Sequence, residues 1–350
     1  MKRHRSHIGQ SAAVSVLLLA ALFLIPLAVV GPFRTALSGG KDAPDSQTEP
    51  QKPEPEPLPP FISGALDGDI PLRVLDGETV LEMDLGTYLV GVVRAEMPAS
   101  FELEALKAQT CAARTYTLYK LVSGSSHGET ADICTDSTCC QAYISEEKAF
   151  ANWGDDANAY EKKIEQAVLE TDGQAILYDG MPILAVFHSS SAGLTRAAGE
   201  VWLNDMPYLQ PVDSPEPDDA IPNYYSRVDF TAEDFQSKFL EAHPEADFSG
   251  DISGWLSAPV TDEAGSVLTV QVGGVEVKGS QLRTILGLRS ACFTWEAKEG
   301  QISFFVTGYG HGVGLSQYGA NQMAAEGADF REILTHYYTG VTVGPTGQEQ

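Results

Sequence analysis

The sequence predicts an α+β fold, in which helices and strands share a core without alternating strictly. Helical and strand patterns follow one another irregularly along the chain, and no internal repeat of fixed period is found. Residues 61–345 suffice for a sizeable core, as one domain with insertions or as two. Apolar spacing predicts helices at 85–96, 101–122, 160–170, 231–242 and 329–339. It predicts strands at 72–75, 78–82, 174–178, 182–188, 267–272 and 301–307.

The N-terminal segment has the pattern of a membrane anchor. Residues 8–33 carry no charged side chain and follow a cationic tail, residues 1–7. This predicts a single transmembrane helix, with the N-terminus in the cytoplasm and a catalytic domain with a groove, residues 61–345, outside. The alternative is a cleaved signal peptide, but its apolar core usually spans only about 7–15 residues. Residues 34–60 are rich in Pro and Glu, which predicts an extended linker, and residues 346–350 form a short tail.

The chain is strongly acidic, with a formal net charge of −26. The segment 61–350 holds 16 basic and 43 acidic residues, which gives it a net charge of −27. Such a charge opposes binding to nucleic acid or anionic lipid. A neutral or cationic substrate, or a basic partner, fits better.

Glu96 is the first candidate for chemistry. In the helix predicted at 85–96, Leu85, Leu89, Val92 and Val93 stack on the face that carries Glu96. A carboxylate on an apolar face either finds a cation or holds its proton through a raised pKa. A protonated carboxyl near neutral pH is what a general acid requires.

The next helix supplies two candidate cations. Met97-Pro98 ends the first helix, and the second would place Lys107 and Arg114 on its buried face. With a tight turn between antiparallel helices, either cation could meet Glu96. A buried structural ion pair is the alternative interpretation, because such pairs also perturb pKa values.

A cluster of cysteines lies near one histidine. His127 and Cys134 are followed by the adjacent pair Cys139 and Cys140. Outside the cytoplasm a disulfide from Cys134 to Cys139 or Cys140 is one interpretation. A zinc site built on His127, Cys134 and Cys140 with one more ligand is the other.

Two further segments are candidates for substrate binding. A buried strand runs into His188 and the serines that follow it, and a glycine-rich loop presents His311. The loop does not meet the register of a dinucleotide-binding loop. The G-x-S-x-G nucleophile elbow is absent, which argues against a serine hydrolase.

Several blocks together resemble the stage II sporulation protein D family. They are Gly91-Val-Val-Arg-Ala-Glu-Met-Pro98, Leu103-Glu-Ala-Leu-Lys-Ala-Gln109, Ala112-Ala-Arg-Thr-Tyr116, Ile133-Cys-Thr-Asp-Ser-Thr-Cys-Cys-Gln-Ala-Tyr143, Phe187-His-Ser-Ser-Ser-Ala-Gly193, Leu286-Gly-Leu-Arg-Ser290 and Gly310-His-Gly-Val-Gly-Leu-Ser-Gln-Tyr-Gly-Ala320. The resemblance covers roughly residues 70–345. It implies a membrane-anchored lytic transglycosylase of the sporulation septum, which cuts glycan strands after an amidase has removed the stem peptides. An amidase and other engulfment proteins are the implied partners.

The resemblance also assigns roles to residues. Glu96 would be the catalytic acid, and Arg114 and Lys107 would orient it or bind substrate. The implied zinc ligands are His127, Cys134 and Cys140, and the chain departs from its relatives at Cys139, where they usually carry a residue such as His. The residues expected in the glycan groove are His188, Ser189, Ser190, His311, Gln317 and Tyr318.

The implied reaction needs one carboxyl only. Hydrolytic glycosidases generally use two, but attack by the sugar's own 6-hydroxyl consumes no water, so Glu96 can first give and then take the proton. A rival hypothesis is a non-catalytic module that activates an amidase, because amidase enhancers share this domain. A zinc hydrolase is a third hypothesis, which predicts loss of activity with a chelator.

Overall fold

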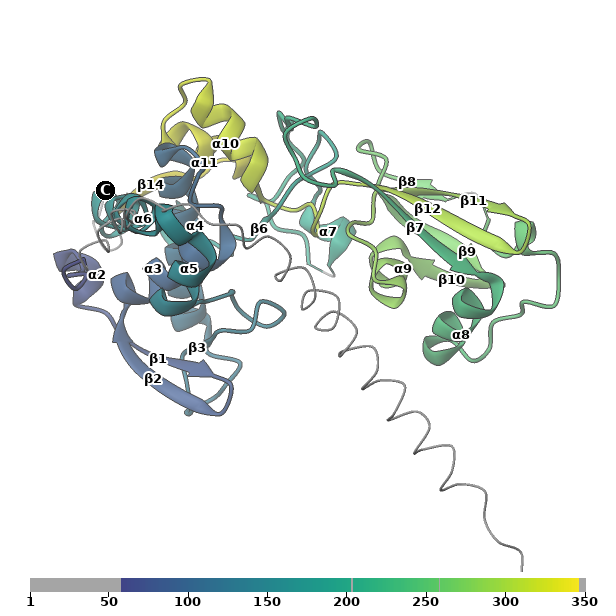
Figure 1. Cartoon of the computed structure of the whole chain (residues 1–350), viewed down its shortest axis with the longest axis horizontal. Coiled ribbons are helices and arrows are strands. Elements are labelled where there is room, and N and C mark those ends of the chain that lie inside the picture. Colours follow the sequence, from purple (N-terminus) through teal and green to yellow (C-terminus); the bar gives the residue numbers. More distant parts are fainter. Residues whose placement is uncertain (1–57, 203, 258, 346–350) are drawn as a thin grey trace, which may run out of the picture. The chain divides into compact units, whose positions relative to one another are not determined.

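The computed structural model describes residues 58–202, 204–257 and 259–345. Helices and strands mix within it without alternating, which confirms the predicted α+β class (Figure 1). The predicted anchor at 8–33 lies outside the described residues, as does almost all of the linker. Within the described ranges, no helix combines the length and apolar character needed to cross a bilayer.

The first part of the fold is a small sheet with three helices packed near it. Strands β1 (Pro71–Asp76) and β2 (Thr79–Asp84) form an antiparallel hairpin, and β3 (Ile133–Cys134) pairs with β1 in parallel. The helices are the short α2 (Ala65–Gly68), α3 (Leu85–Glu96) and α4 (Leu103–Ser123). Their apolar residues form one core with those of α6 (Ala157–Glu170). Helix α5 (Glu146–Trp153) and a 3-10 turn, η2 (Gly154–Asp156), precede α6.

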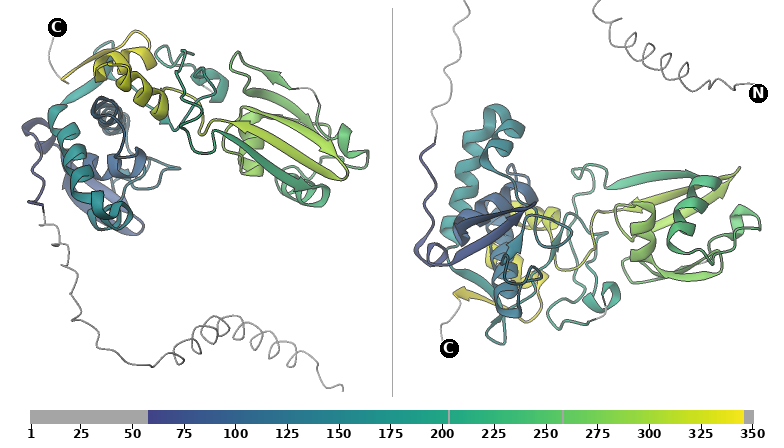
Figure 2. Two further views of the ribbon diagram at one scale, coloured as in Figure 1. Left: turned by 45° about the horizontal axis from the view of Figure 1, so that its top comes forward. Right: turned by 90° about the horizontal axis from the view of Figure 1, so that it is seen from below.

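Helix α4 is buried on nearly all sides. Every residue from Ala108 to Thr117 is buried, because α3, α6, α10 (Gln317–Ala325), α11 (Phe330–Tyr337) and a strand pack around it. Figure 1 shows α4 among these helices, and in Figure 2 the yellow C-terminal helices return to it. The prediction of a single buried face on this helix was therefore wrong.

A second core lies between α4 and the C-terminal segment. Strand β4 (Gln174–Tyr178) pairs with β5 (Met181–Pro182) on one side and with β14 (Thr342–Pro345) on the other. Strands β6 (Phe187–His188) and β13 (Leu315–Ser316) form a short parallel pair. This pair joins segments more than a hundred residues apart in the sequence.

The third core belongs to residues 225–307, with the short helix α7 (Ala198–Val201) preceding them. One sheet has the strand order β11 (Phe293–Lys298), β12 (Gln301–Thr307), β7 (Tyr225–Thr231), and the other has β10 (Val275–Lys278), β9 (Val267–Val272), β8 (Val260–Thr261). Helices α8 (Ala232–Ala242) and α9 (Gly279–Leu286) pack on these strands, and a 3-10 turn, η3 (Ile252–Gly254), contacts β11.

The strand predicted at 182–188 is wrong in its middle. The N–H groups of Ala185 and Val186 donate to the carbonyls of Ile183 and Leu184, so tight turns replace a continuous ladder between β5 and β6. The other predicted strands and all five predicted helices correspond to elements of the structure.

Candidate active site

Glu96 is the last residue of α3, and its side chain is half-buried. Its Oε1 accepts a hydrogen bond of 2.7 Å from the Ala142 N–H. Burial raises the pKa of Glu96 above its ordinary value, although the Ala142 hydrogen bond favours the ionised form and offsets part of that rise. The negative end of the α3 dipole also disfavours a carboxylate here. The carboxyl group is therefore held toward its protonated form.

Glu96 opens onto a pocket of about 260 Å³. The lining residues come from distant parts of the chain and are Glu96, Tyr116, Ser137, Thr138, Cys139, Cys140, Gln141, Val186, Phe187 and His311. The pocket therefore brings the carboxyl together with the cysteine cluster and the glycine-rich loop. Sequence spacing alone could not have predicted this juxtaposition.

The two cations of α4 pair with other carboxylates, so their predicted contact with Glu96 is wrong. Arg114 is fully buried and makes a bidentate pair with Asp67 of α2, with its Nη2 at 2.7 Å from Oδ2. Lys107 lies 2.7 Å from Glu104 and 2.6 Å from Glu170. The cause is the burial of α4 on nearly all sides, which turns these side chains toward α2 and α6. A catalytic role for Lys107 and Arg114 remains a prediction.

The predicted groove segments lie together. Strand β6 leads to His188, β13 runs beside it, and Ser190 pairs with Tyr309 across an antiparallel bridge. The His188 ring packs 5.6 Å from that of His311, and Trp202 packs 5.2 Å from His311 on another side. Burial and neighbouring positive charges lower the pKa of His188 to about 3 and that of His311 to about 4. Both rings are therefore neutral at neutral pH.

Two glycines make this close approach possible. Gly310 has φ of +120°, and a Cβ atom there would lie 2.7 Å from the His188 Cβ. A Cβ on Gly314, which has φ of +71°, would lie 2.2 Å from the Val186 carbonyl oxygen. The glycine-rich loop thus serves to bring two backbones together.

The other predicted groove residues divide into exposed and buried groups. Ser189 and Tyr318 are partly exposed, and the Tyr318 N–H donates to the Ser189 carbonyl at 3.0 Å. Ser190 and Gln317 are buried, and Gln317 donates to Gln109 at 3.2 Å. Those two can contact a ligand only if their surroundings move.

Glu216 is a half-buried acid that the sequence patterns do not indicate. Its Oε1 accepts hydrogen bonds from the hydroxyl groups of Ser191, Ser214 and Ser316. It therefore ties the serine loop after β6 to the start of α10. Nothing in the local sequence marks it, because its partners are remote.

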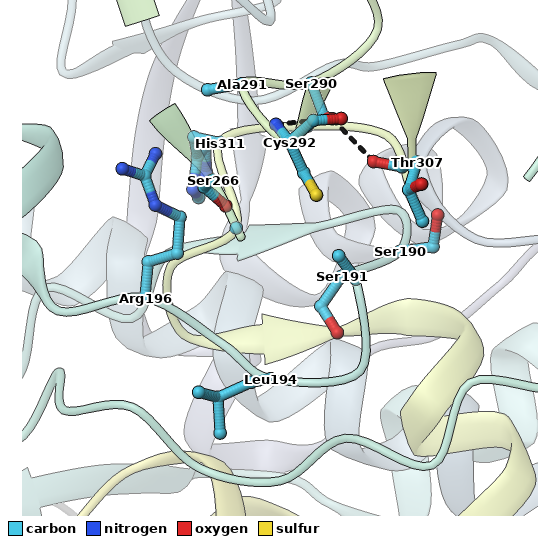
Figure 3. A pocket seen from close by; sticks show the side chains of 13 residues that line it. Ser190, Ser191, Leu194, Arg196, Ser266, Ser290, Ala291, Cys292, Thr307 and His311 are labelled. Atoms are coloured by element: carbon cyan, nitrogen blue, oxygen red, sulfur yellow. Dashed lines mark hydrogen bonds between the residues drawn. The ribbon is translucent and has the colours of Figure 1, made fainter. Parts of the chain in front are cut away.

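A small cavity of about 20 Å³ lies behind His311 (Figure 3). Arg196 lines it and pairs with Asp262 at 2.7 Å, while Ser290 donates to the Thr307 carbonyl at 2.6 Å. Its size suits about one water molecule.

The four ligand atoms of His127, Cys134, Cys139 and Cys140 lie within 4.8 Å of one another. The His127 Nε2 is 3.6 Å from the Cys139 sulfur and 3.7 Å from the Cys140 sulfur, and the two sulfurs are 3.8 Å apart. Zn–S bonds of about 2.3 Å and Zn–N bonds of about 2.0 Å give tetrahedral edges of roughly 3.5–3.8 Å. These residues therefore fit a tetrahedral zinc ion. All five cysteines of the chain are free thiols here, without the alternative disulfide.

One loop connects this cluster to Glu96. It carries Cys139 and Cys140 and, two residues later, the Ala142 N–H that holds Glu96. Tyr143 then packs against Gly91 of α3, where a Cβ atom would lie 2.0 Å from the tyrosine ring. The conformation of this loop therefore helps to fix the position of the Glu96 carboxyl.

Comparison with known proteins gives a consistent set of relatives. A family model described as "Stage II sporulation protein" matches residues 76–178. The chain is 34% identical over 335 residues to stage II sporulation protein D of Bacillus subtilis (strain 168), over 95% of both chains. It is 37% identical over 275 residues to the protein of that name from Bacillus amyloliquefaciens, over 78% of both. It is also 30% identical over 304 residues to the amidase enhancer of Bacillus subtilis (strain 168), which covers 73% of this chain and 40% of that protein.

Proposed function

The chain belongs to the stage II sporulation protein D family, and from this premise we propose that it is a lytic transglycosylase that cuts peptide-stripped peptidoglycan strands during sporulation. One observation carries the proposal: the carboxyl of Glu96 lines a pocket, and its burial raises its pKa. Within the described residues no cation forms an ion pair with it. An acid of this kind can give up a proton near neutral pH.

The reaction proceeds in two proton transfers. Glu96 donates its proton to the oxygen between N-acetylmuramic acid and N-acetylglucosamine as that glycosidic bond breaks. The resulting carboxylate takes the proton of the C6 hydroxyl as O6 bonds to C1, which gives a 1,6-anhydro end and consumes no water. The Ala142 N–H fixes Oε1 and steadies the carboxylate between the two transfers.

The side chains around Glu96 complete the site. Neutral His311 and the Tyr116 ring line the same pocket and offer hydrogen-bonding and stacking surfaces for sugar rings. Trp202, which is partly exposed beside His311, extends that surface. Ser189 and Tyr318, which are partly exposed, are further residues that we expect to contact the glycan strand.

The decisive experiment compares the purified chain with Glu96→Gln on peptide-free glycan strands. We expect 1,6-anhydro ends from the wild type and a rate lower by about 10²–10⁴-fold from the variant, the usual contribution of general acid–base catalysis. Muropeptide analysis by mass spectrometry identifies the 1,6-anhydro ends and measures the rate at which they form. Cleavage by the variant at the wild-type rate would refute the role of Glu96.

We also propose that His127, Cys134, Cys139 and Cys140 hold a structural zinc ion. Four protein ligands close the coordination sphere, so the ion would supply structural order to the loop that ends at Ala142. Elemental analysis should find about one zinc per wild-type chain and much less in Cys140→Ser. Groups that orient a site without touching the reacting atoms commonly change activity by about 10–100-fold when they are lost. Because the zinc ion would order the loop that holds Glu96, we expect a loss of cleavage of this size in Cys140→Ser. Full activity in a zinc-free preparation would contradict the proposal.

The sequence pattern supports a location for this activity. We place residues 8–33 in the cell membrane as a single span, with residues 34–60 as a linker and residues 61–345 outside the cytoplasm at the sporulation septum. An amidase that strips the strands and other engulfment proteins are the expected partners.

The similarity to an amidase enhancer favours a second candidate function, activation of an amidase without cleavage. In that case Glu96→Gln would leave the products unchanged while the chain still increased the rate of a purified amidase. The same muropeptide analysis separates the two functions.

A further inference from the structure

Two arginines, Arg283 in α9 and Arg289 in the loop that follows α9, lie next to the glycine-rich loop that carries His311. Arg283 of α9 donates its Nε to the carbonyls of Leu288 and Arg289, at 3.3 and 3.1 Å. The Arg289 carbonyl also accepts a hydrogen bond of 3.0 Å from the N–H of Gly310, the residue before His311. The charge of Arg283 acts on His311, which lines the pocket, and the Arg289 guanidinium stacks on Tyr309, two residues before His311.

Neither arginine has an ion-pair partner in the described part of the chain. The Arg289 guanidinium stacks on Tyr309, 4.0 Å from the ring centre, and its buried Nε has no hydrogen-bond partner there. Arg283 uses only its Nε. Arg196, the third arginine near His311, is in contrast paired with Asp262. Burial and the nearby charge of Arg196 lower the pKa of Arg283, which also indicates a local excess of positive charge.

This excess stands out in a chain of net charge −26. Most arginines elsewhere in the described residues have a carboxylate partner, as in the pairs Arg73–Asp132, Arg94–Glu161, Arg114–Asp67 and Arg227–Asp229. A half-buried guanidinium without a carboxylate keeps an uncompensated charge, which a bound anion would stabilise. The planar donors of arginine match the two oxygens of a carboxylate.

We infer that Arg283 and Arg289 bind the carboxylate of the lactyl group of N-acetylmuramic acid. This inference rests on the proposed function. In intact peptidoglycan that carboxyl forms the amide bond to the stem peptide, and hydrolysis of the amide leaves a free carboxylate. A stripped strand carries one such charge per disaccharide, which the acidic surface of the chain repels. The arginine pair offsets this repulsion at one place and selects strands whose peptides are gone.

The test is a binding experiment with the Glu96→Gln chain, which keeps the strands uncut. One ligand is peptide-stripped glycan, and the other is the same glycan with its lactyl carboxylates converted to methylamides. We expect about 10–100-fold tighter binding of the carboxylate form, the range for hydrogen bonds to a charged group. Adding Arg283→Gln and Arg289→Gln should abolish this preference, whereas adding Arg227→Gln, at an exposed arginine of β7, should leave it intact.

Equal binding of the two glycans by the Glu96→Gln chain would overturn the inference. This comparison needs no arginine variant, so a folding defect in the double variant cannot obscure it. A preference that survives in a folded double variant, checked by circular dichroism, would also overturn it. The proposed function fails on a different result, the absence of Glu96-dependent cleavage, and that result leaves the binding comparison valid.

Discussion

The two ends of α3 carry carboxylates in opposite environments. Asp84 is the N-cap, and its side chain accepts hydrogen bonds from the Thr87 N–H at 2.9 Å and from the hydroxyl groups of Thr87 and Ser63. Burial alone would raise the pKa of Asp84, but these bonds bring it below its ordinary value. Glu96, at the other end, accepts one backbone hydrogen bond and has a raised pKa.

The difference separates an acid with several hydrogen-bond donors from one with a single donor. The N-terminal end of a helix offers free N–H donors and a favourable dipole, whereas the C-terminal end offers neither. A buried carboxylate that stabilises the fold has hydrogen-bond donors or a cation as partners; Asp67, for example, is paired with Arg114. Glu96 is left with a single donor, which is the environment that the proposed proton transfers require.

The largest effect on stability should come from removing a satisfied buried acid. Asp67→Ala leaves Arg114 charged and buried without its carboxylate, so we expect the free energy of unfolding to fall by about 3–5 kcal/mol. Chemical denaturation measures it. Arg73→Ala, which breaks the exposed pair with Asp132, is the matched control and should cost much less. Equal losses would mean that burial does not distinguish these pairs.

The pH dependence of stability should have opposite signs at the two ends of α3. The folded pKa of Glu96 is raised, so its contribution is fully present below the unfolded value of about 4.3 and is lost as pH rises through the folded pKa. The loss is about 1.4 kcal/mol for each pKa unit of separation. The folded pKa of Asp84 is lowered, so its contribution is lost as pH falls below about 3.9.

Denaturation curves of the wild type, Glu96→Gln and Asp84→Asn over a pH series measure both slopes. Glu96→Gln should reduce the decline above about pH 4.3, to which Glu165 and Glu216 with their raised pKa values also contribute, and Asp84→Asn should weaken the decline at acid pH. A Glu96→Gln chain with an unchanged profile would show that Glu96 titrates normally.

The smallest effect on the free energy of unfolding should come from replacing the N-cap residue of α3, Asp84. Asp84→Ala removes the side-chain acceptor for the Thr87 N–H, which typically costs about 1 kcal/mol. Cleavage of stripped strands should continue, because the cap lies at the far end of the helix from Glu96. A loss of cleavage as large as that of Glu96→Gln would mean that the two ends are not separable.

Local patterns predicted much of the fold. The helix at 85–96 and the strands at 174–178 and 267–272 agree with α3, β4 and β9, because their apolar spacing matches their burial. Helix α5 and the strands β7, β10, β11 and β14 were not predicted, since their exposed or short patterns give a weak signal.

The site was harder to predict than the fold. The grouping of His127 with Cys134, Cys139 and Cys140 could be predicted, because these residues lie within one short segment of the sequence. The partners of Arg114 and Lys107 could not be predicted, because α4 is enclosed by elements from both ends of the chain. Glu216 and the arginine pair depend on contacts between loops that are remote in sequence.

The parallel contact between β6 and β13 has a practical consequence for dissecting this protein. It helps to keep His311 in the same pocket as Glu96, although the matched family segment ends at residue 178. A minimal fragment cut at that boundary would keep the acid and the thiols but would lose Val186, Phe187 and His311. Inhibitor screening and domain transplantation therefore require the chain through β14, because α10, α11 and β14 also pack around α4 and β4.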